Sequence, residues 1–537
     1  IPILIGGAAG ENLSPARLLQ TNASPGTRSS SIFRPPHRRQ KHRPKMVRER
    51  ASAKIEGFPT FGAQDACTTG DPPPMSLFRK KNVEHMIAAS VQNAGLKKAL
   101  GALDLTFLGV GAIIGTGIFV LTGTGAVQAG PALMVSFLIA AVACGFAALA
   151  YAEFASTIPV AGSIYTYSYA TLGELAAWII GWDLMLEYGL ATSAVSVGWS
   201  GYLQSLLSGF GVSLPVALTA APGALPGHET LFNLPAFLVM MAITALLSIG
   251  VRESARINNI MVAIKVTVVL LVIGVGVFHV TPANWHPFMP NGWNGVFGAA
   301  AVMFFAFIGF DSVSSAAEEV KNPKRDLPIG IIASLGVCAV LYVAVAAVVT
   351  GIVPSAQFAN ISHPVSYALQ VVGEKWVAGF IDLGAVLGML TVILVMAYGQ
   401  TRVIFAMSRD GLLPAKLSKV HPKFATPFFT TWLVGIFFGL IGALVPLNVL
   451  AELINIGTLA AFSMVSIAVL VLRKTHPELP RAFRCPGVPV VPVLAVASCL
   501  FLMVNLQAVT WIAFVVWLLI GMVIYFGYSR RHSKLAK

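Results

Sequence analysis

Long apolar runs alternate with short polar or basic segments along most of the chain. From Leu103 onward we count twelve such runs of about twenty residues, the length with which an α-helix crosses a bilayer core. The pattern therefore predicts an all-α polytopic membrane protein with twelve transmembrane helices. The predicted helices begin near Leu103, Pro131, Glu174, Leu231, Asn258, Gly295, Pro328, Trp376, Pro427, Ala451, Pro489 and Val509.

Two of these runs are interrupted by glycine. The first reads LDLTFLGVGAIIGTGIFVLTGTGAVQAG, and the sixth, FFAFIGFDSVSSAAEEV, has Gly309 followed by small and polar residues. The two runs stand five segments apart, and the segments after them both open on proline, at Pro131 and Pro328. Because five is odd, segments 6 to 10 would repeat segments 1 to 5 with inverted topology. Glycine-interrupted segments at matching places of two inverted halves indicate a transporter binding site at the membrane midplane.

Unwinding a helix inside the membrane frees backbone groups that lipid cannot satisfy. The half-helix that resumes at Gly115, Thr116 and Gly117 directs free N–H groups and a positive dipole end toward an anion. Freed carbonyls at Ile113 and around residues 305–308 suit a cation. A zwitterionic amino acid fits both ends. The alternative is close helix packing through the GxxxG spacing of the first run, but the matching break in the sixth run favours the binding site.

Four stretches of the sequence resemble one known family. They are GAIIGTGIFVLTG, PVAGSIYTYSYATLGELAAWIIGW, EEVKNPKRDLPIGI and GQTRVIFAMSRDGLLP, which begin at residues 111, 159, 318 and 399. In this order they resemble the amino acid–polyamine–organocation (APC) superfamily, and within it the bacterial twelve-span form of the cationic amino-acid transporter (CAT) branch. The resemblance covers about residues 75–530. It implies a leucine-transporter-like five-plus-five inverted repeat with unwound helices 1 and 6, plus two extra C-terminal helices.

The domain organisation follows from this fold and from a change in composition. Residues 1–74 are rich in proline and serine and hold 11 basic against 5 acidic residues. We expect them to be a disordered or non-native extension, the alternative being a basic arm that touches anionic lipid or nucleic acid. The remaining predicted parts are a cytoplasmic segment (75–102), inverted repeat 1 (103–280), inverted repeat 2 (281–474), helices 11 and 12 (475–529) and a cytoplasmic C-terminus (530–537).

Charge and composition narrow the function. The chain is 56% hydrophobic and 11% charged, which excludes a soluble enzyme. Of the 25 basic residues after residue 74, 23 fall in segments that alternate onto one side, so both termini are predicted to be cytoplasmic in a multi-pass protein of the cell membrane. The net charge of +14 therefore requires no nucleic acid. Without paired cysteines or HExxH, GxSxG or P-loop motifs, we expect no metal, cofactor or enzymatic activity.

Three ionisable residues inside the runs are candidates for proton coupling. Lys265 lies seven residues past Asn258, about 10 Å along a helix. The alternative to a coupling role is that its side chain snorkels to the membrane interface. The resemblance implies that Lys265 occupies the place of the sodium ion in sodium-coupled relatives, so that a proton gradient drives transport. Asp311 follows the break of the sixth run and can equally cap the resumed half-helix. Glu187 in the third run faces the pocket or pairs with Lys265. Asp183, one turn earlier, lies nearer the cytoplasmic end and is expected to be interfacial.

The resemblance also implies the residues that contact the substrate. Phe305 is expected to close over the substrate as a gate, although aromatic runs also face lipid or pack in the core. Met396 in the eighth run is expected to line the side-chain pocket and to favour small neutral amino acids, with cationic ones as a further class. The alternative role for Met396 is ordinary packing. The predicted contacts are Ile113, Ile114, Gly115, Thr116, Gly117, Phe305, Ala306, Ile308 and Met396.

These inferences predict a proton-coupled symporter of L-amino acids that works by alternating access. The alternative is an exchanger that swaps an amino acid for a polyamine or a decarboxylation product, and a third class is a non-transporting amino-acid sensor. The expected partners are the amino-acid substrate and the lipid bilayer, and the expected functional unit is a monomer. A small membrane peptide or a sterol-like lipid is left open as a further partner.

Overall fold

The computed structural model describes Arg79 and residues 99–158, 163–250 and 255–534. The chain separates into two units, residues 1–72 and 73–537, and all described residues belong to the second. The extension predicted at 1–74 and most of the segment predicted at 75–102 lie outside the described residues. The described part is helical, and an isolated bridge joins Leu100 to Val320. The predicted all-α class is therefore confirmed.

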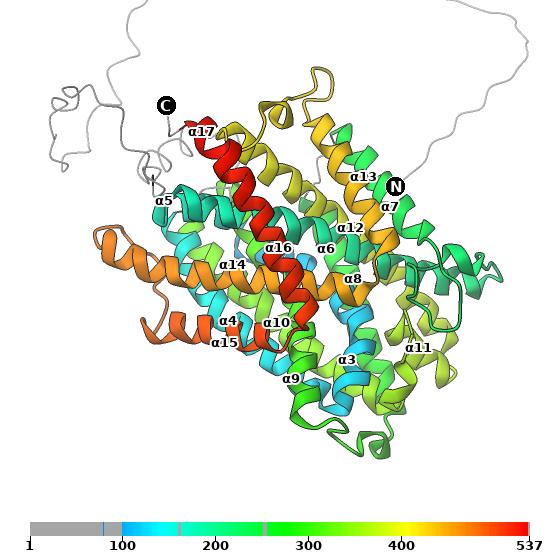
Figure 1. Cartoon of the computed structure of the whole chain (residues 1–537). Helices are drawn as coiled ribbons and strands as arrows, with labels where there is room; N and C mark the ends of the chain where they lie inside the picture. The colour runs from blue at the N-terminus through cyan, green and yellow to red at the C-terminus, as the bar shows by residue number, and fades with distance from the viewer. Residues whose placement is uncertain (1–78, 80–98, 159–162, 251–254, 535–537) are drawn as a thin grey trace, which may run out of the picture. The chain divides into compact units, whose positions relative to one another are not determined.

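Each predicted span coincides with a helix that begins within a few residues of the predicted start (Figure 1). Within the described residues, seven helices are long and apolar enough to cross a membrane, and four apolar helices are shorter. The chain is thus a multi-pass membrane protein, and the count of twelve spans stays a prediction. The helices in these spans are α2 (Ala102–Ile113), η1 (Gly117–Leu121), α3 (Thr122–Ala129), α4 (Leu133–Thr157), α6 (Glu174–Gly209), α7 (Leu234–Ser248), α8 (Ala255–Gly276), α9 (Gly292–Met303), η6 (Phe304–Phe307), η7 (Phe310–Glu319), α10 (Pro323–Ile352), α12 (Lys375–Arg409), α13 (Phe428–Leu444), α14 (Leu447–Thr475), α15 (Val490–Val504) and α16 (Ala508–Ile524).

Local sequence explains where several of these helices begin. Gly130 adopts a φ of +66°, which glycine tolerates, and turns the chain from α3 into α4. The Asn233 side chain accepts a hydrogen bond from the Ala236 amide at 3.2 Å and so caps α7. Pro323 stands at the first position of α10, where its missing N–H costs nothing. Between the spans lie the shorter helices α5 (Ser163–Thr171) and α11 (Pro364–Val371), and α17 (Arg530–His532) follows the last span.

Small residues and aromatic stacks pack the helices together. A Cβ at Gly109 of α2 would fall against Ser334 of α10, so the missing side chain lets these helices approach closely. At the C-terminal end, α16 contacts both α14 and α6 (Figure 1), and Trp182 stacks on Trp517 with ring centroids 4.4 Å apart. Val509 and Val523 of α16 are exposed, as residues that face lipid chains would be.

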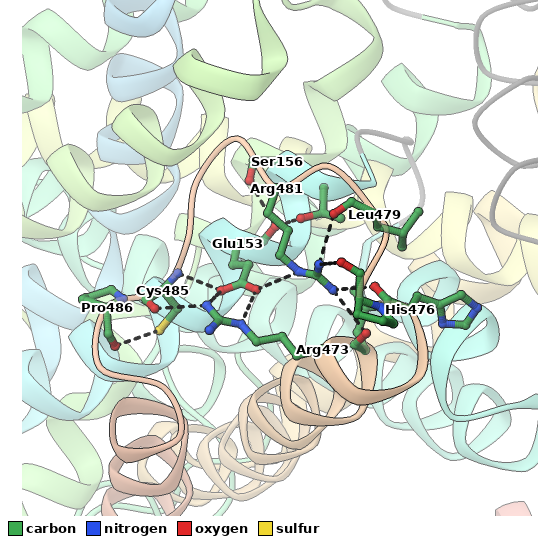
Figure 2. A network of polar contacts seen from close by, with 11 residues as sticks. Glu153, Ser156, Arg473, His476, Leu479, Arg481, Cys485 and Pro486 are labelled. Atoms are coloured by element: carbon green, nitrogen blue, oxygen red, sulfur yellow. Dashed lines mark hydrogen bonds and ion pairs between the residues drawn. The ribbon is translucent and has the colours of Figure 1, made fainter. Parts of the chain in front are cut away.

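The C-terminal end of α4 carries a buried ion-pair network (Figure 2). Glu153, 1% exposed, receives hydrogen bonds from Arg473 Nε at 2.9 Å and Nη2 at 2.6 Å. The Cys485 amide donates to the same carboxylate at 2.7 Å, and Arg481 Nε lies 3.5 Å away. Arg481 also donates to four backbone carbonyls, from Leu472 to Leu479. This arrangement, which we call the Glu153 network, fixes α4 to the end of α14 and to the loop that follows it.

Candidate functional site

The first predicted span is interrupted in its middle. Helix α2 ends at Ile113, Ile114 is extended (φ −72°, ψ 102°), and helical structure resumes as the π-helix η1 at Gly117. Three tyrosine or lysine side chains from other helices bind backbone carbonyls on either side of this break. Lys265 Nζ donates to the Gly111 carbonyl at 2.6 Å, Tyr342 Oη to the Ile113 carbonyl at 2.9 Å and Tyr202 Oη to the Phe119 carbonyl at 2.6 Å.

The sixth predicted span is interrupted in a similar way. Helix α9 ends at Met303 and continues as the 3₁₀ turn η6, after which Ile308 is extended (φ −64°, ψ 138°). Gly309 then adopts a φ of +123°, which only glycine adopts without strain. Asn455 Nδ2 of α14 donates to the carbonyls of Ala301 and Val302 at 2.8 and 3.1 Å. Polar side chains from other helices thus donate hydrogen bonds to backbone carbonyls of both interrupted spans. Lipid chains could not do this.

The two breaks lie against each other. A Cβ at Gly117 would fall on the Ala306 backbone, and a Cβ at Gly309 would lie 2.9 Å from the Ala112 carbonyl carbon. Because neither neighbour is the end of a flexible side chain, both positions require glycine. All nine predicted substrate contacts are buried: Ile113, Ile114, Gly115, Thr116, Gly117, Phe305, Ala306, Ile308 and Met396.

Helix α12 closes one side of the break in the first span. Thr116 Oγ1 donates to Met389 Sδ at 3.3 Å, and a Cβ at Gly115 would lie 3.4 Å from a methyl group of Val392. Met396 lies one helical turn beyond Val392, on the same face of α12. The structure therefore places the predicted Met396 on the helix face that lines the break.

Phe305 and Phe307 differ in their packing. Phe307 makes ring contacts with Phe137 and Tyr342, at centroid distances of 6.2 and 5.2 Å. Phe305 is 7% exposed and makes no ring contact with the described residues. Of the two, Phe305 is the side chain whose motion would break no aromatic pair, and its role as the gate stays a prediction.

Lys265 lies between the broken helix and α12. Its side chain is 0% exposed, and a Cβ at Gly388 of α12 would come within 2.9 Å of Lys265 Cγ. The ammonium is directed at the Gly111 carbonyl, at the end of α2, rather than at the membrane surface. The positive charge stands where the freed carbonyls of an interrupted helix would otherwise attract a cation.

A profile of the amino acid permease family matches residues 100–528. The chain belongs to this family. It is 67% identical over 460 residues to the branched-chain amino acid permease BcaP of Bacillus subtilis, covering 86% of this chain and 99% of that protein. It is 55% identical over 463 residues to the methylthioribose transporter of the same organism, covering 86% and 100%. The chloroplastic cationic amino acid transporter 9 of Arabidopsis thaliana is 34% identical over 545 residues, covering 89% and 94%.

These comparisons confirm the resemblance to APC permeases and to their CAT branch, and they confirm that the chain is a transporter rather than an enzyme. For this permease the family also implies the leucine-transporter-like fold. The paired interruptions of the first and sixth spans agree with that fold.

Three carboxylates of the permease are buried close together. Asp183 and Glu187 lie one turn apart on α6, Asp311 lies on η7, and each is 2% exposed. They are close enough for Asp311 and Asp183 to act electrostatically on Glu187. Tyr188 Oη donates to Asp311 Oδ2 at 3.2 Å. Within the described part of the chain, both Glu187 oxygens, Asp311 Oδ1 and Asp183 Oδ1 have no hydrogen-bond partner. We call the three acids, Asp183, Glu187 and Asp311, the acidic cluster.

The acidic cluster joins two predicted residues to one that the sequence placed differently. Glu187 and Asp311 are predicted coupling residues, and the structure brings them together on one side of the break in the sixth span. Asp183 reads as an interfacial residue from its position in the run, yet it is buried against Gly457 of α14, where a Cβ would lie 2.7 Å from its Oδ1.

Several residues at the site escape sequence reasoning. Tyr342, Tyr202 and Asn455 bind the broken helices, and Met389 and Val392 pack on Gly115 and Thr116. A polar side chain in the middle of an apolar span is a usable signal for Tyr342 and Asn455. Nothing local distinguishes Met389 or Val392, because both are ordinary residues of an apolar helix.

Proposed function

We propose that the chain is a proton-coupled symporter of neutral amino acids in the cell membrane, with both termini in the cytoplasm. It works by alternating access around the facing breaks of α2–η1 and α9–η6. The observation that carries this proposal is the 2.6 Å hydrogen bond from the buried Lys265 ammonium to the Gly111 carbonyl at the end of α2. A lysine in this position links its own protonation to the conformation of the broken helix.

The coupling follows from the chemistry of a buried amine. A protonated ammonium donates to the Gly111 carbonyl and fixes the end of α2. A neutral amine binds this carbonyl more weakly than an ammonium does, so loss of the proton would loosen the end of α2. The acidic cluster offers a second place for a proton, since unpaired buried carboxylates are costly when ionised. Asp311 belongs to the other interrupted span, so protonation there acts on the second half of the same site.

The lining of the site supports a neutral substrate. None of the nine predicted contacts has a charged side chain, so a cationic side chain would have no counter-charge among them. Met396 and Val392 present apolar surface beside the break. The similarity to a branched-chain amino acid permease supports an aliphatic amino acid such as leucine as the substrate. The backbone groups of the two breaks would bind its carboxylate and ammonium.

The test is uptake of leucine into proteoliposomes, with and without an imposed inward proton gradient. We expect the wild type to accumulate leucine with the gradient, and Lys265→Ala to lose at least about tenfold of this accumulation. Lys419→Ala, at an exposed loop position, is the matched control and should retain it. Gradient-driven accumulation by Lys265→Ala at the wild-type level would overturn the role of Lys265.

Counterflow separates the alternatives. A wild type that exchanges external for internal leucine but ignores the gradient is an exchanger, and the symport proposal is then wrong. Methylthioribose is the second substrate to measure, because a related transporter is named for it. Gradient-driven uptake of methylthioribose in preference to leucine would overturn the substrate and leave the coupling mechanism in place.

A further inference from the structure

The segment after the last predicted span packs against the helix bundle. Helix α16 continues as the π-helix η10 (Tyr525–Ser529) and the short helix α17 (Arg530–His532) (Figure 1). Every fourth side chain along this continuation is buried, and each of them carries a hydroxyl group: Tyr525, Ser529 and Ser533. We call residues 525–534 the C-terminal segment. One polar face of this segment is therefore directed into the protein.

A buried carboxylate is the first attachment of the C-terminal segment. Glu174, which begins α6, is 1% exposed. Its Oε1 accepts a hydrogen bond from Tyr525 Oη at 3.2 Å, and its Oε2 accepts one from Ser533 Oγ at 2.6 Å. The Oε2 atom also accepts a hydrogen bond from Tyr169 Oη of α5 at 3.0 Å. One carboxylate thus joins α5, α6 and the C-terminal segment.

The loop that follows α12 is the second attachment. Ser529 Oγ donates to the Leu412 carbonyl at 2.6 Å, and the Lys534 amide donates to the Asp410 carbonyl at 3.0 Å. The Asp410 side chain accepts a hydrogen bond from Tyr165 Oη of α5 at 2.7 Å. The loop is therefore joined both to α5 and to the C-terminal segment.

The loop and the C-terminal segment approach each other closely. Gly411 adopts a φ of +85°, and a Cβ built there would fall on the His532 carbonyl oxygen. Position 411 therefore requires glycine while the segment stays in place. Helix α12 ends at Arg409, and its face with Met396 lines the break in the first span. The C-terminal segment is thus attached directly beyond the end of a helix of the site.

Different interactions hold α16 and the C-terminal segment. Aromatic rings pack α16 on α6, from Trp517 on Trp182 to Tyr525 beside Trp178. Beyond Tyr525, the hydroxyl groups of the two buried serines donate to Leu412 and Glu174. Water can exchange with a hydroxyl group as a hydrogen-bond partner, whereas separating packed rings exposes apolar surface. The serines can therefore be released while α16 stays packed.

We propose that the C-terminal segment is a latch of the transport cycle, an inference that rests on the alternating access proposed above. In the conformation described here, the latch fastens α5, the start of α6 and the end of α12 to one another. These ends lie on the side of the membrane that we propose is cytoplasmic. Alternating access requires helix ends on one side to separate and to close again. Release of Ser529 and Ser533 lets α12 move relative to α6, and their return closes this side.

Hydrogen exchange of the full chain, measured by mass spectrometry, tests the attachment. In Ser533→Asp an ionised side chain has no proton to donate, and it places a second carboxylate beside Glu174. We expect the backbone amides of α5 and of residues 410–412 to exchange at least about tenfold faster than in the wild type, and those of α16 to be unchanged. Gly527→Asp is the matched control, since it adds the same charge to the same segment at an exposed position where a Cβ meets no atom within 4 Å.

Unchanged exchange in Ser533→Asp, or an equal increase in Gly527→Asp, would overturn the latch. This measurement uses no substrate and no proton gradient. Its outcome is therefore independent of whether the proposed substrate and coupling ion are correct.

A reversible cross-link tests whether release belongs to the transport cycle. A bis-methanethiosulfonate reagent joins the two thiols of the double variant Glu174→Cys, Ser533→Cys, at positions whose native side chains are hydrogen-bonded. We expect the linked protein to lose at least about tenfold of its leucine counterflow and to regain it when a reducing agent removes the link. Each single variant, treated in the same way, should show equal counterflow before and after reduction, which controls for the native cysteines.

Equal counterflow of the linked and reduced double variant would overturn the latch. Counterflow needs no proton gradient, and methylthioribose takes the place of leucine if the wild type prefers it. A failure of the symport proposal would appear in the wild type, whereas a failure of the latch appears only in the comparison of linked with reduced protein.

Discussion

Two of the places where the permease buries acids differ in their surroundings. Glu153 is 1% exposed, and both its oxygens are occupied by arginine and amide donors (Figure 2). Asp183, Glu187 and Asp311 are buried to the same degree, yet four of their six carboxylate oxygens lack a hydrogen-bond partner among the described residues. The two places therefore differ in the number of hydrogen-bond donors to the carboxylates and not in burial.

This difference separates a structural acid from a functional one. A buried carboxylate with complete partners stabilises the fold only as long as every partner is present. One without partners has a free-energy cost that a bound proton or cation removes. The Glu153 network connects parts of the chain that lie far apart in sequence, whereas the acidic cluster lies beside the broken sixth span. Substitutions at the two places should therefore affect different measurements.

The largest expected effect on stability comes from Glu153→Ala. It leaves Arg473 and the mostly buried Arg481 facing each other without their common anion. We expect the free energy of unfolding to fall by about 3 kcal/mol, as when one partner of a buried pair is removed. Chemical unfolding of the purified protein in detergent measures it, with Glu229→Ala at an exposed position as the control. An unchanged stability would show that the Glu153 network is not structural.

The next prediction concerns the alkylation rate of Cys485, whose amide belongs to the Glu153 network. Burial, and then the nearby charge of Glu153, raise the pKa of Cys485 to about 11. The thiol is thus protonated at neutral pH, and its alkylation rate should rise about tenfold for each pH unit between 7 and 9. In Glu153→Gln the charge is removed while the burial of Cys485 stays, so the pKa of the thiol should fall and labelling at pH 8 should be faster than in the wild type, as measured by peptide mass spectrometry. Equal rates in the two proteins would contradict the link between Cys485 and Glu153.

Tyr188→Phe should have a smaller effect on stability still. It removes the hydroxyl that donates to Asp311 Oδ2 at 3.2 Å and changes little else in the packing. The loss of one buried hydrogen bond corresponds to about 1 kcal/mol, measurable as a lower melting temperature. Because the Asp311 carboxylate loses a hydrogen-bond donor, the pH profile of leucine uptake should also shift. A melting temperature and a pH profile that both match the wild type would show that the Tyr188 hydroxyl has no effect on the acidic cluster.

The smallest effect on stability, together with a large effect on transport, is expected for Glu187→Gln. Neither oxygen of Glu187 has a hydrogen-bond partner among the described residues, and an amide of the same shape carries no charge to bury. The free energy of unfolding should change by no more than about 0.5 kcal/mol, or rise. Gradient-driven leucine uptake should nevertheless fall at least about tenfold. A variant that unfolds, or that transports normally, would break the contrast between the acidic cluster and the Glu153 network.

Sequence reasoning found the parts of the site that have a local signature. The density of glycine around Gly115 and Gly117, and Gly309 in the sixth run, predicts where the two spans are interrupted. Lys265 stands out because it is a charge in an apolar run. Helical spans are also local, because their length and hydropathy are read directly from the chain.

The remainder depends on contacts between residues that are distant in sequence. The tyrosine that binds the Ile113 carbonyl comes from α10, and the asparagine that binds the end of α9 comes from α14. The partners of Glu153 lie more than three hundred positions later in the chain, so nothing near it in the sequence indicates a fully paired buried acid. Asp183 shows the same limit, because its depth depends on the packing of α14 against α6 rather than on its place in the run.

The contact between Gly117 and Ala306 has a consequence for how permeases of this kind diverge. No side chain fits at position 117 while the Ala306 backbone stays where it is, so the two halves of the chain cannot vary independently at their crossing point. Helix α12, with Val392 and Met396, is free of that restriction because it meets Gly115 through the side chain of Val392 rather than through backbone. Substitutions on α12 can therefore reshape the site while this crossing stays as it is, and we expect selection for a new substrate to act first on α12.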